Sequence, residues 1–347
     1  MRILATIERI PGGLMIVPLM LGALVNTFAP QALEIGGFTQ ALFKDGAMAV
    51  IGMFLVCMGA QLPIKATGPV AEKGLAILIG KYVAGAGVGL AVGLMMPDGM
   101  LWGLAPLAII AAMTNSNGGL FLALTSEFGN KTDRSSIAVI AFNDGPFLTL
   151  ITLGAAGLAQ IPLEAVIAVI VPILIGFVLG NLDEEIREFL SKGEKLLIPF
   201  FAFPLGTGIS LTTLFDAGMS GVLLGVLTVL ISGGLAMLVL WLVQVARRRP
   251  PHRRNLISAV AESSTAGNAV ATPAVVAAAD PAYAAIANAA TAQIAAAVVT
   301  TAILTPIATV LVYRWQMRRG IDPMQEYEDP ELNGTAEPPE TARPQPA

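Results

Sequence analysis

An apolar segment long enough to cross a bilayer is interrupted in its middle by polar residues and glycines. The segment runs from about Leu101 to Thr125, and the interruption reads Thr114, Asn115, Ser116, Asn117, Gly118, Gly119. A membrane-spanning helix must satisfy every backbone hydrogen bond internally, because hydrocarbon offers no partner. Such a break is therefore tolerated only where it is buried in protein or lines a wet cavity.

A second apolar segment is interrupted in the same way between Ala261 and Thr272. Its polar residues are Glu262, Ser263, Ser264, Thr265 and Asn268, with Gly267 among them. Two interrupted helices in corresponding places are typical of secondary transporters, whose substrate sites lie at the breaks. In membranes such polar residues also join helices by hydrogen bonds, and that alternative stays open.

The composition is that of a polytopic membrane protein. Hydrophobic residues make up 55% of the 347 residues and charged residues only 13%, against about 25% charged in soluble domains. The single cysteine excludes an intrachain disulfide, and with one histidine the sequence suggests neither a metal site nor a cofactor. A phosphate-binding GxxxxGK[ST] loop and an HExxH motif are both absent, so we expect neither an ATP-driven pump nor an enzyme.

Apolar runs near 20 residues predict an all-α protein with ten transmembrane helices. We place them near residues 10–28, 46–62, 74–96, 101–125, 136–159, 162–180, 196–213, 219–245, 255–279 and 283–313. Basic residues fall in alternate loops, most densely at 247–254, which predicts that both termini are cytoplasmic. Residues 1–319 would form the transporter domain. Residues 320–347, rich in Pro, Glu, Asp and Gln, are predicted to be a disordered cytoplasmic tail.

An internal repeat relates residues of about 8–159 to residues of about 160–315. Pro18 and Gly22 match Pro172 and Gly176, Gly59 matches Gly206, and the break at Asn115 matches the break at Glu262. Each half holds five predicted helices, so the second half must enter the membrane with opposite polarity. The sequence therefore predicts two inverted five-helix repeats, an architecture found in many transporters.

The two breaks predict a binding site for a small polar anion. A broken helix leaves a half-helix N-terminus, which carries unpaired N–H donors and about half a positive charge. The polar side chains nearby add donors and acceptors suited to a hydroxylated substrate with one carboxylate. The candidate substrate-binding residues are Thr114, Asn115, Asn117, Gly118, Gly119, Ser263, Ser264, Thr265 and Asn268.

Two acids lie inside predicted helices and are candidate proton carriers. Asp144 precedes Gly145 and Pro146, which loosen the fifth helix, and Glu262 lies in the second break. A carboxylate at membrane depth is costly and is by default a functional hypothesis, although each acid could instead cap a broken helix end. Lys81 lies in the third predicted helix, and we expect its long side chain to extend to the cytoplasmic surface.

Four stretches of this sequence resemble the 2-keto-3-deoxygluconate permeases. They are ERIPGGLMIVPLMLGALVNTF at 8–28, MTNSNGGLF at 113–121, GNLDEEIREFLSKGEKLLIPFFAFPLG at 180–206 and SSTAGNAVATP at 263–273. The resemblance runs from about residue 5 to residue 315. It implies a proton-coupled importer of 2-keto-3-deoxygluconate in a bacterial inner membrane.

The resemblance also implies the bile-acid-symporter-like fold. In that fold the first, second, sixth and seventh helices would form a panel domain and the other six a core domain. The fourth and ninth helices would be unwound where they cross. A sodium-coupled organic-anion symporter of the same fold, or a channel, remains an alternative. A sodium ion would be held by carbonyls of the breaks with Asn115 or Glu262.

Overall fold

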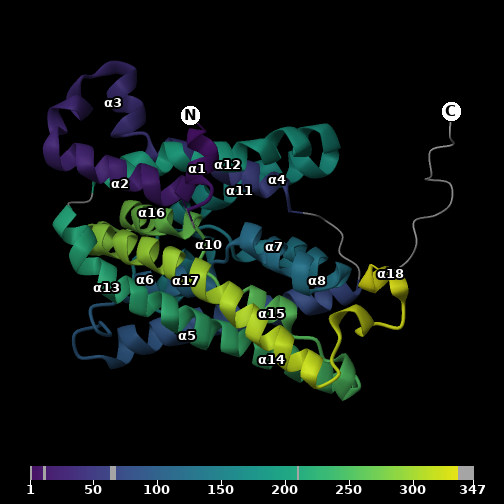
Figure 1. Cartoon of the computed structure of the whole chain (residues 1–347). Helices are drawn as coiled ribbons and strands as arrows, with labels where there is room; N and C mark the ends of the chain where they lie inside the picture. The colour runs from purple at the N-terminus through teal and green to yellow at the C-terminus, as the bar shows by residue number, and fades with distance from the viewer. Residues whose placement is uncertain (1, 11–12, 63–67, 209–210, 335–347) are drawn as a thin grey trace, which may run out of the picture.

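The computed structural model describes residues 2–10, 13–62, 68–208 and 211–334. Within these ranges the regular structure is helical, and the single β contact is an isolated bridge between Leu101 and Leu104. The helices form two groups that meet along one face (Figure 1).

The first group contains four long helices. These are α2 (Gly13–Phe28), α4 (Ala47–Ala60), α11 (Leu163–Leu182) and α12 (Glu184–Thr207). Helix α12 packs on α2 and α4, and α11 packs on α4. The short elements α1 (Ile3–Ile7), η1 (Pro30–Glu34) and α3 (Gly37–Phe43) flank them. These four helices cover the first, second, sixth and seventh predicted spans, the set that the family resemblance groups together.

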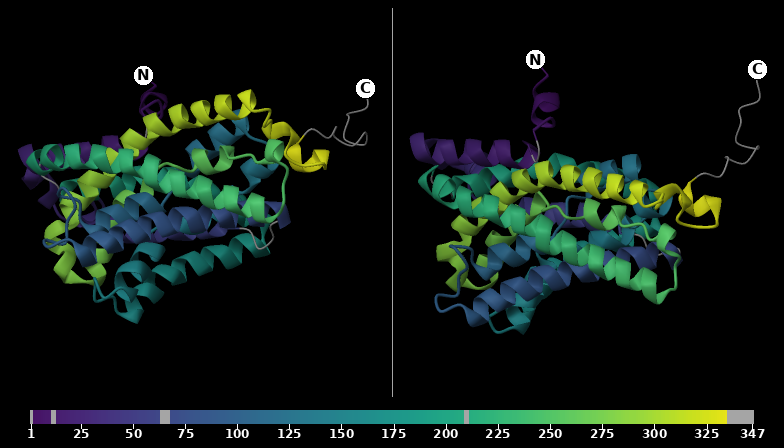
Figure 2. Two further views of the ribbon diagram at one scale, coloured as in Figure 1. Left: turned by 90° about the horizontal axis from the view of Figure 1, so that it is seen from below. Right: turned by 60° about the horizontal axis from the view of Figure 1, so that its bottom comes forward.

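The second group surrounds α6 (Pro106–Thr114), in which every residue from Leu107 onward is buried. Helix α13 (Leu211–Leu227) runs along α17 (Ala284–Arg318), while α5 (Gly68–Met95) packs on α6 and α14 (Gly233–Ala246), as Figure 2 helps to follow. The remaining elements are α7 (Gly118–Phe128), α8 (Lys131–Ser135), α9 (Ile137–Ile140), η2 (Ala141–Asn143), α10 (Phe147–Ala155), η3 (Thr228–Ser232), η4 (Pro251–Arg253), α15 (Ile257–Ala261), η5 (Asn268–Ala271), α16 (Thr272–Ala279), η6 (Pro281–Tyr283), η7 (Pro323–Gln325) and α18 (Pro330–Asn333).

Glycines at four-residue spacing let these helices approach closely. A Cβ on Gly85 or Gly89 of α5 would collide with side chains of α6, and a Cβ on Gly221 or Gly225 would collide with α17. Small residues at helix contacts are the usual means of close packing in membranes, where lipid removes the hydrophobic drive for association. The glycine spacing of the sequence thus determines which faces of α5 and α13 are buried.

The coarse membrane architecture agrees with the sequence, whereas the count of ten crossings stays a prediction. Every predicted span overlaps at least one helix. Among the described residues five helical stretches are long and apolar enough to cross a bilayer, and two bent helix pairs raise that number to seven. Helix α2 and the stretch Asn268–Ala279 are apolar but shorter. Helix α11 exposes a row of large apolar side chains, including Leu163, Leu174, Val178 and Leu182, as expected for a helix that faces lipid.

The beginning of the predicted disordered tail is folded. Residues after Gly320 form η7 and α18 and turn back against α8 (Figure 1). Composition predicted disorder because this segment cannot build an apolar core of its own. Its acids instead pair with basic groups of the bundle, which composition does not reveal. Residues 335–347, the rest of the predicted tail, lie outside the described residues.

Glu326 is the residue that attaches this C-terminal segment. Its buried carboxylate accepts hydrogen bonds from Lys73 Nζ at 2.6 Å, Arg249 Nη1 at 2.8 Å and Asn130 Nδ2 at 2.7 Å. Lys73 Nζ also donates to Asp133 Oδ1 at 2.7 Å. The cluster brings four chain segments together at one end of the molecule. Arg249 comes from the 247–254 segment that the basic residues place in the cytoplasm, so this end is the predicted cytoplasmic face.

An aromatic ring closes the same cluster. The guanidinium carbon of Arg249 lies 4.9 Å from the centroid of the Tyr327 ring, at cation–π distance. Burial raises the pKa of the Tyr327 hydroxyl above its ordinary value, so the phenol stays neutral to a higher pH than an exposed tyrosine would. The C-terminal segment therefore contributes both a charge and a ring to the end of the helix bundle.

We expect Glu326→Ala to destabilise the protein strongly, because it leaves the buried Lys73 without one of its two carboxylates. Removing one partner of a buried ion pair costs roughly 3–5 kcal/mol. The measurement is thermal unfolding of purified protein in detergent. Glu328→Ala is the matched control, since Glu328 pairs with Arg253 while 85% exposed, and exposed pairs contribute about 0–1 kcal/mol. Equal unfolding temperatures for the two variants would contradict the structural role of Glu326.

Candidate functional site

The first predicted break is present and separates α6 from α7. Asn115 and Asn117 are extended, and the Asn117 side chain accepts a hydrogen bond from the Leu120 N–H at 3.0 Å, which caps α7. Thr114 Oγ1 and Asn115 Nδ2 donate to the carbonyls of Ile110 and Ala111 in the preceding turn. The same side chains that weaken the helix therefore satisfy part of the backbone that the break exposes.

The second predicted break separates α15 from η5. Threonines of α17 satisfy its backbone, because Thr305 Oγ1 donates to the Ser263 carbonyl at 3.1 Å and Thr301 Oγ1 accepts from the Thr265 N–H at 3.0 Å. Broken backbone at membrane depth requires such partners from neighbouring helices. The long helix α17 thus serves as the support of the second break.

The two breaks contact each other directly. The Asn117 N–H donates to Ser264 Oγ at 3.0 Å, and Thr265 Oγ1 donates to the Ala112 carbonyl at 3.1 Å. Each break therefore supplies hydrogen-bond partners for the other. Their correspondence in the sequence is matched by contact in space.

The fifth predicted span is also broken, which the sequence indicated only as a loosened helix. Helix η2 ends at Asn143, α10 begins at Phe147, and the two halves of the span differ in direction by 50°. Gly145 adopts a φ of +85°, a conformation that favours glycine, and Pro146 follows it. Asp144 lies at this bend in extended conformation.

A cavity of about 790 Å³ lies between the two helix groups at the breaks. The second group lines it with Ser116, Asn117, Gly118, Gly119, Asp144, Gly267 and Asn268, and the first group with Met15, Phe54, Met58, Gln61 and Lys195. The first group also contributes Glu8 and Ser191, so both walls combine a few polar side chains with apolar ones, an arrangement common in small-molecule sites.

The structure divides the predicted substrate-binding residues into two sets. Asn117, Gly118, Gly119 and Asn268 line the cavity. The other five are buried and form hydrogen bonds that hold the breaks, and they are Thr114, Asn115, Ser263, Ser264 and Thr265. Residue type could not separate the two sets, because the same hydroxyl or amide suits either task.

The N-terminus of α7 faces the cavity through two glycines. Within the described part of the chain, the structure gives the N–H groups of Gly118 and Gly119 no hydrogen-bond acceptor. A Cβ added at either glycine would have its nearest neighbour at 3.5 Å, so side-chain atoms do not fill this space. Free donors at a helix N-terminus, together with the helix dipole, favour an anion at this position.

The two candidate acids occupy different positions. Asp144 is half-buried and lines the cavity. Glu262 is fully buried behind it, with Oε1 3.4 Å from Asn143 Nδ2. Asn143 also donates to Ser116 Oγ at 3.0 Å, so it links Glu262 to the first break. Of the two acids, Asp144 is the one beside the cavity.

The expectation that Lys81 reaches the membrane surface was wrong. Lys81 is completely buried, and its Nζ donates to the carbonyls of Glu262 and Ser264, each at 2.7 Å. The reason is its depth, because α5 begins at Gly68 and Lys81 lies midway along its 28 residues. The helix begins earlier than the apolar run suggests. Lys81 is therefore too deep along it to reach the surface.

Sequence reasoning also missed Lys195 as a cavity residue. It lies just before the seventh predicted span, yet it lines the cavity from α12 together with Ser191 and Ile198. These three residues are spaced as one face of a helix, and that periodicity was the available signal.

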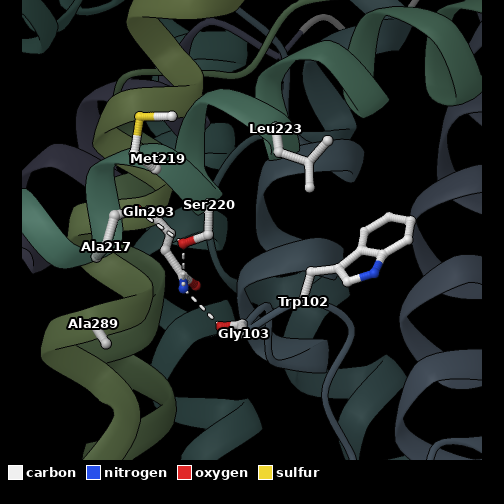
Figure 3. Close-up of a pocket in the computed structure, with 8 residues that line it drawn as sticks. All are labelled: Trp102, Gly103, Ala217, Met219, Ser220, Leu223, Ala289 and Gln293. Atoms are coloured by element: carbon white, nitrogen blue, oxygen red, sulfur yellow. Dashed lines mark hydrogen bonds between the residues drawn. The ribbon is translucent and has the colours of Figure 1, made fainter.

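A second hollow of about 640 Å³ lies between the loop after α5 and the helices α13 and α17 (Figure 3). Its main polar group, Gln293, donates through Nε2 to the Gly103 carbonyl at 2.8 Å and to Ser220 Oγ at 3.1 Å. None of its lining residues is charged, and none was predicted to bind substrate. The cavity at the breaks is therefore the candidate functional site.

Comparison with known proteins identifies a single family. The family model described as 2-keto-3-deoxygluconate permease matches residues 4–318. 2-keto-3-deoxygluconate permease 1 of Salmonella typhimurium is 52% identical over 319 residues, covering 92% of this chain and 98% of the relative. The 2-keto-3-deoxygluconate permease of Bacillus subtilis is 43% identical, covering 90% and 94%. Among solved structures, a sodium proton antiporter from Methanocaldococcus jannaschii aligns with a TM-score of 0.45 and 16% identity, covering 91% of this chain and 98% of the antiporter chain.

Cysteine labelling tests the geometry of the cavity without reference to transport. The native chain has one cysteine, so Cys57→Ala provides a cysteine-free background. In that background we expect Gly119→Cys to react with a small hydrophilic thiol reagent, because Gly119 is exposed in the cavity. Ser263→Cys is the matched control, because Ser263 is 1% exposed and its replacement is nearly isosteric. Faster labelling at position 263 than at position 119 would contradict the division of the site.

Proposed function

The chain belongs to the 2-keto-3-deoxygluconate permease family, and we propose that it imports 2-keto-3-deoxygluconate with protons across the inner membrane by alternating access. As a permease it is a bacterial membrane transporter and not an enzyme. The observation that carries the proposal is the cavity at the two breaks, because both helix groups line it.

The cavity suits the chemistry of a sugar acid. Such a substrate has one carboxylate and several hydroxyl groups. The carboxylate would accept hydrogen bonds from the free N–H groups of Gly118 and Gly119 at the start of α7. Lys195 on the opposite wall would add a positive charge, while Asn117 and Asn268 offer donors and acceptors to the hydroxyls.

Asp144 is the proposed proton carrier because it shares the cavity with the substrate. Two like charges about 4 Å apart repel by about 4 kcal/mol at an effective dielectric of about 20. A proton on Asp144 removes this repulsion, so proton binding and anion binding favour each other. Release of both on the cytoplasmic side would then return the empty carrier. Glu262, the second predicted carrier, lies behind the cavity and beside Lys81.

Alternating access requires two bodies that move relative to each other. The cavity lies between the two groups, whereas within each group glycines bring helix backbones into direct contact. Gly22 of α2 presses on the α12 backbone at Phe203, and its predicted repeat partner Gly176 of α11 presses on the α4 backbone at Val56. The repeat exchanges α2 with α11 and α4 with α12, so these contacts are equivalent, which supports the proposed inverted repeat.

We expect Asp144→Asn to lose accumulation driven by a pH gradient while it retains exchange of labelled for unlabelled substrate. Exchange does not require the proton to be released, whereas accumulation does. Both activities are measured in proteoliposomes, with imposed proton and sodium gradients applied separately. Asp98→Asn is the control, because Asp98 is an exposed loop residue.

The same assay separates the alternatives. Gradient-driven accumulation that survives in the Asp144→Asn and Glu262→Gln double variant would exclude both acids as the carrier. Accumulation by wild-type protein under a sodium gradient alone would favour the sodium-coupled symporter. Absence of exchange against a substrate gradient would point to a channel.

The role of Lys195 has its own matched pair of variants. Loss of one charge near the substrate carboxylate costs about 1 kcal/mol, which corresponds to about a fivefold rise in KM. We expect this rise in Lys195→Gln. Lys192→Gln should leave KM unchanged, because Lys192 lies on the same helix but is 71% exposed and pairs with Glu188. Equal KM values for the two variants would remove Lys195 from the proposed site.

A further inference from the structure

Lys81 presents a charge to the backbone of the second break. Its ammonium group donates to the carbonyls of Glu262 and Ser264, each at 2.7 Å, and no part of the side chain is exposed. The charges that act on it are those of Glu262 and Asp144. A buried lysine at such depth is costly, so its retention in the middle of α5 calls for a specific task.

The groups around this ammonium are the ligands of a hard monovalent cation. Carbonyl oxygens of unwound helices coordinate sodium in broken-helix transporters. Here the two carbonyls come from one break, and the negative charge of the Glu262 carboxylate acts on the ammonium from beyond ion-pair distance. An ammonium group carries the same charge as an alkali cation and donates to the same kind of oxygen.

The first break receives a neutral partner just before it, at the end of α6. There the Met113 carbonyl accepts a hydrogen bond from Ser232 Oγ at 2.9 Å, a neutral donor from η3. Only the second break therefore has a positive charge bound to its carbonyls among the described contacts of the two breaks. Ser264 in turn accepts from the Asn117 N–H at the cavity, so the position of the charge bears on the substrate site.

We propose that Lys81 is a tethered cation, whose ammonium occupies a latent alkali-cation site formed by the Glu262 and Ser264 carbonyls. Lys81 is thus a positioning residue that makes the second break independent of a mobile metal ion. This role of Lys81 rests on the proposed function, because it assumes that transport is coupled to protons and not to sodium. Removing the Lys81 side chain should allow a sodium ion to bind at this position.

Sodium binding provides the test, and it does not depend on transport. We expect Lys81→Ala in detergent to gain a saturable increase in unfolding temperature with NaCl, relative to choline chloride at equal ionic strength. Wild-type protein should show no such difference. Lys81→Met should show none either, because methionine removes the charge yet fills most of the space. Lys192→Ala controls for loss of a surface lysine, since Lys192 is 71% exposed.

Transport gives a second readout of the same site. In proteoliposomes Lys81→Ala should take up substrate only with sodium present, whereas wild-type uptake should be unchanged when choline replaces sodium. Recovered Lys81→Ala protein without sodium-specific stabilisation would overturn the proposal. If Lys81→Ala is not recovered folded, sodium-specific stabilisation of the wild-type protein alone would overturn it, because the ammonium would then not fill the site. Failure of proton coupling in the wild type would instead count against the proposed function and leave the sodium-binding result intact.

Discussion

The structure depends on the need to satisfy broken backbone inside an apolar helix bundle. Two helices stop in the interior, and hydrocarbon would offer their exposed N–H and C=O groups no partner. The two breaks supply partners for each other, because Asn117 and Thr265 form hydrogen bonds between them. Threonines of α17, Ser232 of η3 and the Lys81 ammonium supply further partners. Among the described contacts the N–H groups of Gly118 and Gly119, at the start of α7, have no acceptor, and both glycines line the cavity.

This arrangement assigns separate tasks to residues of the same chemical type. Five of the predicted substrate-binding residues are buried and form hydrogen bonds that hold the breaks, whereas Asn117, Asn268 and the two glycines line the cavity. The hydrogen bonds at the breaks hold the N–H groups of α7 in a fixed direction. Such preorganised donors favour anion binding, because they need not be reordered when the anion binds. The first group supplies the facing wall, including Gln61 and Lys195, so movement of that group would open or cover the site without breaking the contacts between the two breaks.

Buried charges are compensated at two places, one at the end of the helix bundle and one in its interior. At the end of the bundle, Lys73, Asp133, Arg249 and Glu326 compensate one another and attach the C-terminal segment. In the interior, Lys81 lies among Glu262 and Asp144, with backbone carbonyls as its direct partners. In both places a buried lysine bridges segments that are distant in the sequence. In the interior such a bridge also determines which charges an incoming anion meets.

The sequence by itself determined that the chain is an all-helical membrane protein with two broken helices. Apolar length and the cost of Asn, Ser and Gly inside a helix are local properties, so they can be read without the fold. The glycine spacing of α5 and α13 and the correspondence of the two breaks were also visible. Only the tertiary structure decided which acid lies beside the cavity and how deep Lys81 lies. It also showed that Glu326 anchors a segment expected to be disordered. Burial, distance to a cavity and pairing with a remote charge depend on residues far apart in the chain, and no local pattern encodes them.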